Sequence, residues 1–395
     1  MSAGPLRVEP VQGRGGVKAF VGLPFRLYAG DPSWAPPLRS DVRWVLDEAK
    51  NPFWKHASRR LFLALRGERV VGRVAAIVDA EHNRVHGDRT AFFGFFECER
   101  DPEAARALLD AAEEAVKGML PGCDLLRGPM NPSMNDEVGF LLPKESEPGL
   151  PMIMMTYNPD YYLDLVGAAG FVKEKDLVAI VAPVGENSFQ RLTRIATGVR
   201  RREKGLVVRP IRMDRFAEDL AIVKTIYNGA WEKNWGFVPM TSDEIDAMAK
   251  KLKPILHPPY ILFAEVDGVP VAFHLALPDF NQVLATMGGS LFPLGWLKFL
   301  LGKKKIDRCR TLAFGVLPEY RKRGIDAVVY YEAMKEGIRI GHKWAEFSWM
   351  LEDNLAILRP LEVFGGKVWR RYRVVCRAVF PEGTPRRGIP SGSPP

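Results

Sequence analysis

A cluster of basic residues that ends in a glycine lies near the C-terminal end of the 395-residue chain. An apolar run ends at Pro318, and a second apolar run, with the spacing of a helix, opens at Gly324. Between them lie three consecutive cations, Arg321, Lys322 and Arg323. A helix N-terminus binds anions, because it presents unpaired backbone N–H groups and the positive end of the helix dipole. We therefore expect this loop to hold a phosphate or a pyrophosphate.

Two halves of the chain carry the same order of predicted elements. Each half is predicted to form a hairpin, a third strand, a helix, a second helix and a closing strand, at residues 60–83, 91–97, 101–119, 160–171 and 176–181 in the first half. The counterparts in the second half are expected at residues 260–282, 311–317, 324–339, 354–366 and 371–380. Gly67 and the pair Asp267-Gly268 favour tight turns in the two hairpins. The repeated order indicates a duplication with an α/β (α+β) fold, in which each copy is a mostly antiparallel mixed sheet flanked by helices.

The domain boundaries follow from changes in composition along the chain. We expect a first domain over residues 1–183 and a second over residues 207–380, joined by a basic linker at residues 184–206. The last residues, 381–395, are rich in Pro, Gly and Ser, and they are predicted to be disordered.

The composition restricts the class of partner. The formal net charge of +9 favours an anionic partner. The four cysteines share no metal-type spacing with a histidine pair, so we expect reduced thiols and no metal site. The sequence shows neither a secretory signal nor a run of membrane-span length, which predicts a cytoplasmic protein. The basic stretches at 200–204 and 303–305 lack interleaved aromatic residues, so we expect no nucleic-acid partner.

The basic loop and its surroundings resemble the acyl-CoA site of GNAT (Gcn5-related) N-acyltransferases. In that family an (Arg/Gln)-x-x-Gly-x-(Gly/Ala) loop after the fourth strand holds the pyrophosphate of coenzyme A. Residues 321–325 match this loop, whereas Asp326 stands where the family has Gly or Ala. The resemblance implies that acyl-CoA is contacted by Phe314, Gly315, Val316, Arg321, Lys322, Arg323, Gly324, Ile325 and Asn354. A backbone N–H within residues 314–316 would polarise the thioester carbonyl.

Acyl transfer from a thioester to an amine also needs a base for the amine and a proton for the leaving thiolate. A further strand, the fifth in the GNAT order, is predicted at residues 343–350. Glu346 lies in this strand and Glu352 just beyond it, and either could be the base. The alternative for Glu352 is a structural role, in which its carboxylate lies at the N-terminus of the next helix and is stabilised by the helix dipole. His274 is a third candidate for the base. The alternative is that His274 is a structural histidine, hydrogen-bonded within an apolar strand.

The acid for the thiolate is harder to identify from the sequence. Many GNAT enzymes place a tyrosine on the helix after the fifth strand, but the predicted helix at 354–366 has none. The proton would then come from Tyr320, Tyr330, Tyr331 or water, or the thiolate would leave without an acid.

The first half resembles the same fold but lacks the phosphate loop. Its third strand is followed by Cys98, Glu99, Arg100, Asp101 and Pro102, with no glycine among them. A structural or substrate-binding role is therefore expected for this half. Residues 128–142 and 157–165 resemble bacterial tandem GNAT-like proteins, some of which are linked to ceramide formation.

The resemblance implies an N-acyltransferase that moves an acyl group from acyl-CoA, or from an acyl-carrier protein, to an amphipathic amine. Its most specific form would acylate a long-chain sphingoid base to give a ceramide. Two alternatives remain open: a soluble acetyltransferase for a small polar amine, and a non-catalytic protein that binds acyl thioesters.

An insertion at residues 291–305 combines Leu, Phe and Trp with three terminal lysines. This composition is typical of a segment that lies on an anionic membrane surface, which would make the protein peripheral to the inner membrane. The alternative is an apolar cover packed on the core, with its lysines exposed.

Overall fold

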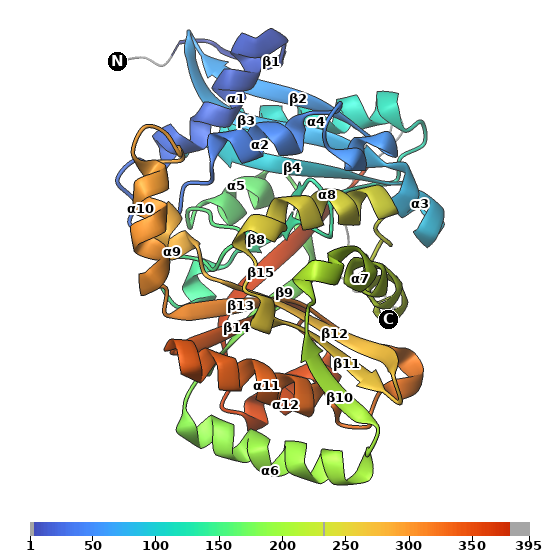
Figure 1. Cartoon of the computed structure of the whole chain (residues 1–395). Helices are drawn as coiled ribbons and strands as arrows, with labels where there is room; N and C mark the ends of the chain where they lie inside the picture. The colour runs from blue at the N-terminus through green and yellow to red at the C-terminus, as the bar shows by residue number, and fades with distance from the viewer. Residues whose placement is uncertain (1–3, 232–233, 380–395) are drawn as a thin grey trace.

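The structure of the protein is a computed structural model that describes residues 4–231 and 234–379 (Figure 1). The tail predicted to be disordered, residues 381–395, lies outside the described residues. The helices and strands of the first half are β1 (Leu6–Pro10), α1 (Gly13–Leu27), α2 (Arg39–Leu46), β2 (Ala57–Arg66), β3 (Arg69–Asp79), α3 (Ala80–His86), β4 (Thr90–Cys98), α4 (Pro102–Met119), β5 (Leu125–Gly128), β6 (Met130–Asn131), β7 (Glu137–Val138), β8 (Phe140–Leu141), α5 (Tyr162–Ala168) and β9 (Val172–Pro183).

The second half follows the same plan with different insertions. Its helices and strands are α6 (Glu186–Arg202), β10 (Leu206–Pro210), α7 (Phe216–Ala230), α8 (Ser242–Leu252), β11 (Ile261–Val266), β12 (Val269–Pro278), α9 (Asn281–Leu284), α10 (Gly295–Gly302), β13 (Arg308–Val316), α11 (Ile325–Ile340), β14 (Trp344–Leu351), α12 (Leu355–Val363) and β15 (Lys367–Ala378). The stretch 184–206, expected as a linker, contains the helix α6, which packs against α11. The division into domains at this stretch remains a prediction.

A 13-stranded sheet runs through both halves. Its order is β1-β2-β3-β4-β5-β15-β9-β14-β13-β12-β11-β10, with β8 beside β15, while β6 and β7 form a separate pair. Among the described strands only β4–β5 and β13–β14 pair in parallel, and the other pairs are antiparallel. This confirms the predicted α/β fold with a mostly antiparallel mixed sheet.

The closing strands of the two halves are exchanged at the centre of the sheet. β9, from the first half, pairs with β14 of the second, and β15, from the second half, pairs with β5 of the first. β9 and β15 also pair with each other over most of their length. In Figure 1 the red strand β15 therefore runs from the lower half of the molecule toward the upper one. Each half needs a strand from the other to complete its sheet.

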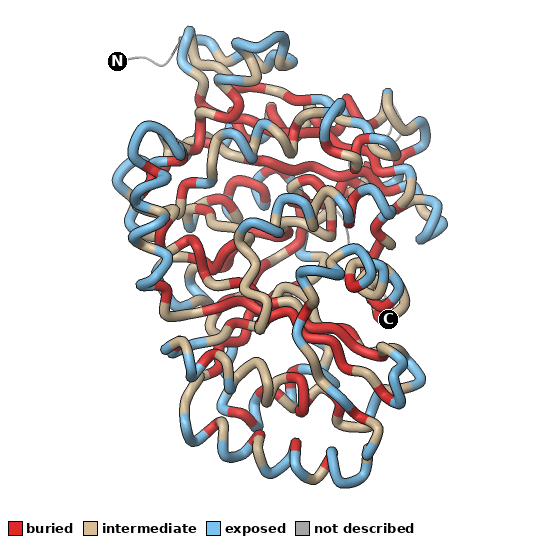
Figure 2. The backbone as a smooth tube through the Cα atoms, viewed as in Figure 1, coloured by how far each residue is buried: buried red, intermediate tan, exposed pale blue. Residues whose placement is uncertain are grey.

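Helices cover both faces of the sheet in each half. In the first half α4 and α5 pack on one face, and α1 and α2 pack on the other. In the second half α6 and α11 cover one face and α7 the other. The strands between these layers form the buried bands of Figure 2.

The helix α4 shows how local sequence fixes one of these layers. The Asp101 side chain accepts a hydrogen bond from the backbone N–H of Ala104 at 3.1 Å, and Pro102 occupies the first turn, where no backbone donor is needed. Its buried residues recur at helical spacing and include Leu108 and Leu109. None of the helices in the part of the chain that is described has the length and apolarity to cross a membrane.

Candidate active site

The strands β13 and β14 pair over a short distance and then separate. Their parallel pairing begins at Arg308 and Trp344 and ends at Thr311 and Phe347. A β-bulge at Leu312 marks the point of separation, because this residue is extra in the register between β12 and β13. Residues 312–316 therefore have no pairing partner on β14 among the described residues. An opening between strands leaves backbone groups that a ligand can bind.

Aromatic side chains line this opening. The ring of Tyr330, on α11, lies 4.9 Å from the ring of Phe314 and 5.3 Å from that of Phe347, measured between centroids. Phe314 is on β13 and Phe347 is on β14, so one ring contacts both walls. All three side chains are half-buried. This lining suits the apolar part of an acyl thioester better than a charged group.

The phosphate loop has a backbone that requires glycine. Gly324 has φ +82°, which is in the left-handed region, and it is the residue before the first turn of α11. A Cβ atom at this position would lie 2.6 Å from Cγ2 of Val199 on α6. The packing of α6 against the start of α11 thus excludes any larger residue without movement.

Two of the three cations in the loop are already bound by protein groups. Arg321 donates to the backbone oxygens of Val316 at 3.2 Å and Ala230 at 2.6 Å. Arg323 pairs with Glu203, with Nε at 3.0 Å from Oε1. Lys322 is exposed, has φ +61°, and makes no hydrogen bond or ion pair with any described residue. Its ammonium is therefore the charge that the loop can offer to an anion most freely.

Glu346 lies on β14 at the base of the opening and is completely buried. Its carboxylate accepts hydrogen bonds from the Ser348 hydroxyl and from Nε1 of Trp369, the latter at 2.7 Å. The Arg310 guanidinium lies 3.8 Å away. Burial raises the pKa of Glu346, and the charge of Arg310 opposes that rise. With both oxygens occupied, this carboxylate holds Arg310 in place beside the last paired residues of β13 and β14.

His274, on β12, is also buried. Its Nδ1 lies 3.1 Å from the backbone oxygen of Tyr260, and since a carbonyl oxygen only accepts, Nδ1 carries the proton. Nε2 then accepts a hydrogen bond from the Thr311 hydroxyl at 3.0 Å. Burial lowers the pKa of His274 to about 4, so the ring is neutral at pH 7.

The other sequence-predicted residues lie beyond the C-terminal ends of β13 and β14. Glu352 follows β14 and pairs with Lys173 Nζ at 2.9 Å. Asn354 precedes the first turn of α12, and no hydrogen bond of its side chain caps that helix. Tyr320 packs beneath the guanidinium of Arg323, which is 5.1 Å from the ring centre. Their roles in binding or catalysis remain predictions.

A cavity of about 650 Å³ lies between the two halves. The first half contributes residues of α1, α2, β3 and β4 and of the segment 129–162, and the second half contributes residues from α8 to α10. Most of the lining is apolar, including Trp34, Trp44, Phe280 and Phe299. Leu312, the bulged residue of β13, packs against the apolar cluster that includes Phe280 and Phe299, so this cluster reaches from the cavity wall to the opening.

Buried polar groups of the first half also line this cavity. Glu97 accepts hydrogen bonds from the hydroxyls of Tyr28 at 2.6 Å and Tyr162 at 2.7 Å, and the Arg73 guanidinium is 3.5 Å away. Burial raises the pKa of Glu97, against the opposing charge of Arg73. Sequence reasoning missed this residue, although a carboxylate that ends the aromatic run of residues 92–96 is a signal that could have indicated it.

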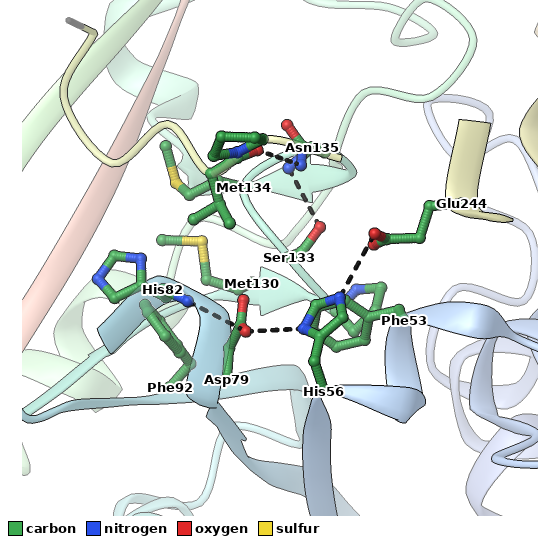
Figure 3. A pocket seen from close by; sticks show the side chains of 13 residues that line it. Phe53, His56, Asp79, His82, Phe92, Met130, Ser133, Met134, Asn135 and Glu244 are labelled. Carbon is green, nitrogen blue, oxygen red and sulfur yellow. Dashed lines mark hydrogen bonds and ion pairs between the residues drawn. The ribbon is translucent and has the colours of Figure 1, made fainter. Parts of the chain in front are cut away.

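A small pocket next to the cavity joins the halves through a histidine (Figure 3). His56, just before β2, lies 3.0 Å from an oxygen of Asp79 and 3.4 Å from an oxygen of Glu244 on α8. Burial lowers the pKa of His56, but the hydrogen bonds to the two carboxylates outweigh it and raise the pKa to about 10. The histidine is therefore charged at pH 7 and holds α8, which lines the cavity, on the first half.

The corresponding opening in the first half is filled by protein. β4 and β5 also separate after a short parallel ladder, but the backbone at Met130 lies so close to Gly94 that no Cβ would fit there. The backbone N–H of Phe95 donates to Oδ1 of Asn131 at 2.6 Å. The groups that could polarise a thioester are thus occupied, which agrees with the missing phosphate loop in this half.

These features define the fold of the tandem GNAT proteins. A tandem GNAT protein from the clavulanic acid biosynthesis pathway aligns with 96% of this chain and 100% of its own length, with a TM-score of 0.56 and 14% identity. A GCN5-related N-acetyltransferase from Sphaerobacter thermophilus aligns with 95% of this chain and 96% of its own, with a TM-score of 0.53 and 12% identity. At these identities the likeness shows the fold.

Two curated relatives show the family. Protein YghO of Escherichia coli (strain K12) is 34% identical over 366 residues, which cover 91% of this chain and 92% of the relative. Bacterial ceramide synthase of Caulobacter vibrioides is 33% identical over 382 residues, which cover 95% and 98%. No protein-family model matches the sequence. The chain belongs to the family of these two proteins and has the tandem GNAT fold.

Proposed function

We propose that this acyltransferase moves a fatty acyl group from acyl-CoA to the amine of a long-chain amino alcohol, giving a ceramide-type product. The observation that carries the proposal is the apolar cavity of about 650 Å³ between the two halves, whose wall shares an apolar cluster with Leu312 of β13. A cavity of this size and lining fits a lipid better than a small polar amine. The name of the relative from Caulobacter vibrioides supports the same substrate class.

The donor would lie in the second half. Residues 321–325 and Asn354 would hold the pyrophosphate and the arm of coenzyme A, and the thioester would enter between β13 and β14. The backbone N–H groups of residues 314–316 would stabilise the oxyanion that forms when the amine attacks the carbonyl carbon. The C–N bond then forms as the C–S bond breaks, the amine loses a proton, and the thiolate takes one up.

Two of the predicted bases have their carboxylates engaged, because Glu346 bonds Ser348 and Trp369 and Glu352 pairs with Lys173. Water in the opening could carry the proton from the amine, with Tyr320 or Tyr330 close to the donor as acid candidates. An acyl-carrier protein is the alternative donor, since the loop would bind its phosphate-linked arm in the same way.

The segment 291–305 would place the protein on an anionic membrane surface. Phe292 is 76% exposed and Leu301 is 64% exposed, and Leu294 and Trp296 are exposed beside them. The three lysines at 303–305 follow directly and are also exposed. Exposed apolar side chains next to a basic cluster favour contact with anionic lipid.

The test is an assay of purified full-length protein with acyl-CoAs from two to eighteen carbons. Each donor is combined with sphinganine or with a small polar amine such as glucosamine, and both free thiol and N-acyl product are measured. We expect product with long-chain donors and sphinganine. Product formed only with acetyl-CoA and the polar amine would contradict the proposal and favour a small-molecule acetyltransferase. If acyl-CoA binds but no acceptor is acylated, the same assay with acylated carrier protein decides between the donors.

A further inference from the structure

The cavity between the halves has an acidic part. Five carboxylates line the cavity, although the protein carries a net charge of +9: those of Glu97, Asp136 and Glu137, with Asp41 and Glu244. Glu97 is hydrogen-bonded to two tyrosines and lies near an arginine, as described above. Asp136 accepts a hydrogen bond from Ser133 Oγ at 2.6 Å. Neither Asp136 nor Glu137 has a Lys, Arg or His of the described chain within ion-pair distance, and Glu137 is the one of the two on which the charge of Arg310 acts.

The environment of Glu137 lacks a positive charge in direct contact. The residue lies on β7, opposite Asn131 of β6, and a hydrogen bond from the Asn131 side chain reaches its carboxylate. Burial raises the pKa of Glu137, and the more distant charge of Arg310 is the largest influence that lowers it. Glu137 is half-buried in the cavity wall, and a cation in contact with such a carboxyl favours its charged form. A cationic ligand in the cavity would supply the missing charge.

The position of Arg310 connects this acidic part to the proposed donor site. Arg310 lies on β13 directly before the last residue paired with β14. Its Nη1 donates to the backbone oxygens of Ile153 at 2.7 Å and Met154 at 2.9 Å, and both residues line the cavity. Its Nε donates to Oγ of Ser348 on β14 at 2.8 Å. The charge of Arg310 also lowers the pKa of Glu137, which links this carboxyl to the part of the cavity wall that Arg310 contacts.

The apolar lining continues from α9 and α10 to the surface. These helices and the residues around them contribute Phe280, Leu284, Met287, Leu291 and Phe299. Leu291 lines the cavity and is also 37% exposed, and its neighbour Phe292 belongs to the exposed apolar segment. A hydrocarbon chain could thus extend from the cavity toward the surface without crossing a polar barrier.

We propose that the cavity binds a single-chain lipid amine, with its ammonium group against Glu137 and its hydrocarbon chain along α9 and α10. This inference deepens the proposed function and rests on it, because it names the acceptor site of the same reaction. Glu137 acts as the residue that selects a cation and places the nitrogen beside the opening of β13 and β14. The neutral alcohol of the same chain length lacks the charge that the site requires.

The test measures binding without turnover, so it can succeed or fail independently of the acylation assay. Full-length protein is titrated with dodecylamine, below its micelle concentration, and with 1-dodecanol, while the fluorescence of the tryptophans in the cavity wall is followed. We expect Glu137→Gln to weaken amine binding at least tenfold and to leave alcohol binding unchanged. Glu265→Gln, in a carboxylate that pairs with Arg209 on β10 outside the cavity, is the matched control and should change neither.

Equal affinity of the natural protein for amine and alcohol would overturn the proposal, as would unchanged amine binding in folded Glu137→Gln. A second variant decides the outcome if Glu137→Gln does not fold. Leu284→Trp adds bulk to the cavity wall beside α9. It should weaken dodecylamine binding at least tenfold and leave hexylamine binding within twofold. Equal losses for both amines, or no loss for either, would show that the chain does not lie along α9 and α10.

Discussion

Lys322 is the residue on which the donor site can be tested most directly. Arg321 and Arg323 hold the loop to Ala230 and Glu203, whereas Lys322 is exposed and makes no hydrogen bond or ion pair with the described residues. The division of roles is physical: two cations fix the shape of the loop, and the third is available to a phosphate. The sequence indicated three equivalent cations, because their partners come from segments about 90 and 120 residues away.

Replacing Lys322 with Glu should weaken binding of coenzyme A by ten- to a hundredfold. A hydrogen bond to a charged group contributes about 1.5–3 kcal/mol, and the new carboxylate would repel phosphate as well. Isothermal titration calorimetry measures the change, and the melting temperature should stay within a few degrees. Lys335→Glu makes the same charge change at an exposed position further along α11 and should leave the affinity unchanged. Equal affinities of Lys322→Glu and the natural protein would remove the loop from the donor site.

Gly324 allows the structural part of the loop to be tested separately. Gly324→Ala must adopt a left-handed φ and also meets Val199, whereas Gly341→Ala, at the other end of α11, has φ +83° and open space around it. Both variants should be destabilised because alanine disfavours a left-handed φ. Gly324→Ala should lose about 1–3 kcal/mol more of the free energy of unfolding, because its Cβ is overpacked against Val199. Urea unfolding of the two variants gives this difference. Equal losses of unfolding free energy in the two variants would mean that α6 can shift away from residue 324 without a measurable cost.

At the scale of elements, the sequence predicted those helices, strands and turns that local sequence patterns determine. The two hairpins, the strands before the helices α4 and α11, and the helices themselves follow from periodicity and turn residues, and the structure contains them all. The exchange of β9 and β15 could not be predicted in this way, since their partners β14 and β5 are far away in the sequence. The cavity could not be predicted for the same reason. Its lining residues, such as Glu137 on β7 and Leu284 on α9, are far apart in the sequence and line one cavity only in the folded chain.

The segment around α10 is the element whose role is most open to experiment. Phe299 is stacked on Phe280 and lines the cavity, so it belongs to the interior, while Phe292 and Trp296 are exposed. Replacing Phe292 and Trp296 with Ser should release the protein from anionic vesicles, because each ring contributes up to about 1.5–3 kcal/mol when buried in lipid. Co-sedimentation with vesicles of phosphatidylglycerol measures the change.

The lysines that follow α10 should act through charge alone. Changing residues 303–305 to Gln should weaken vesicle binding by about 1 kcal/mol per lysine, mainly at low salt. As a control for exposed apolar area, Val207→Ser and Val269→Ser alter exposed residues on the strands β10 and β12 and should not affect vesicle binding. If the double Ser variant still sediments with vesicles while remaining folded, the segment does not contact lipid.

At the scale of the whole molecule, the two halves share one sheet. The exchanged strands β9 and β15 pair with each other and with both sheets, so neither half has a complete sheet alone. Side-chain contacts add to this link around α8, where Lys55 pairs with Asp243 at 2.6 Å and His56 lies between Asp79 and Glu244. Glu244 also lines the cavity, so these contacts position part of the cavity wall.

The charge of His56 makes this link dependent on pH (Figure 3). In the unfolded chain its pKa is near the usual value of 6.5, and in the folded protein Asp79 and Glu244, acting against burial, raise it to about 10. A raised pKa in the folded state means that the stabilisation is complete below pH 6.5 and is lost as the pH rises through about 10. His56→Gln should therefore lower the free energy of unfolding at pH 6, and its deficit relative to the natural protein should shrink between pH 6.5 and 10. Urea unfolding at several pH values measures both proteins, and Glu244→Gln, which removes one of the two carboxylates, should show a smaller pH dependence than the natural protein. If the curves of the natural protein and His56→Gln stay parallel over this range, the histidine does not carry the charge that joins the halves, and the packing around α8 alone closes the cavity.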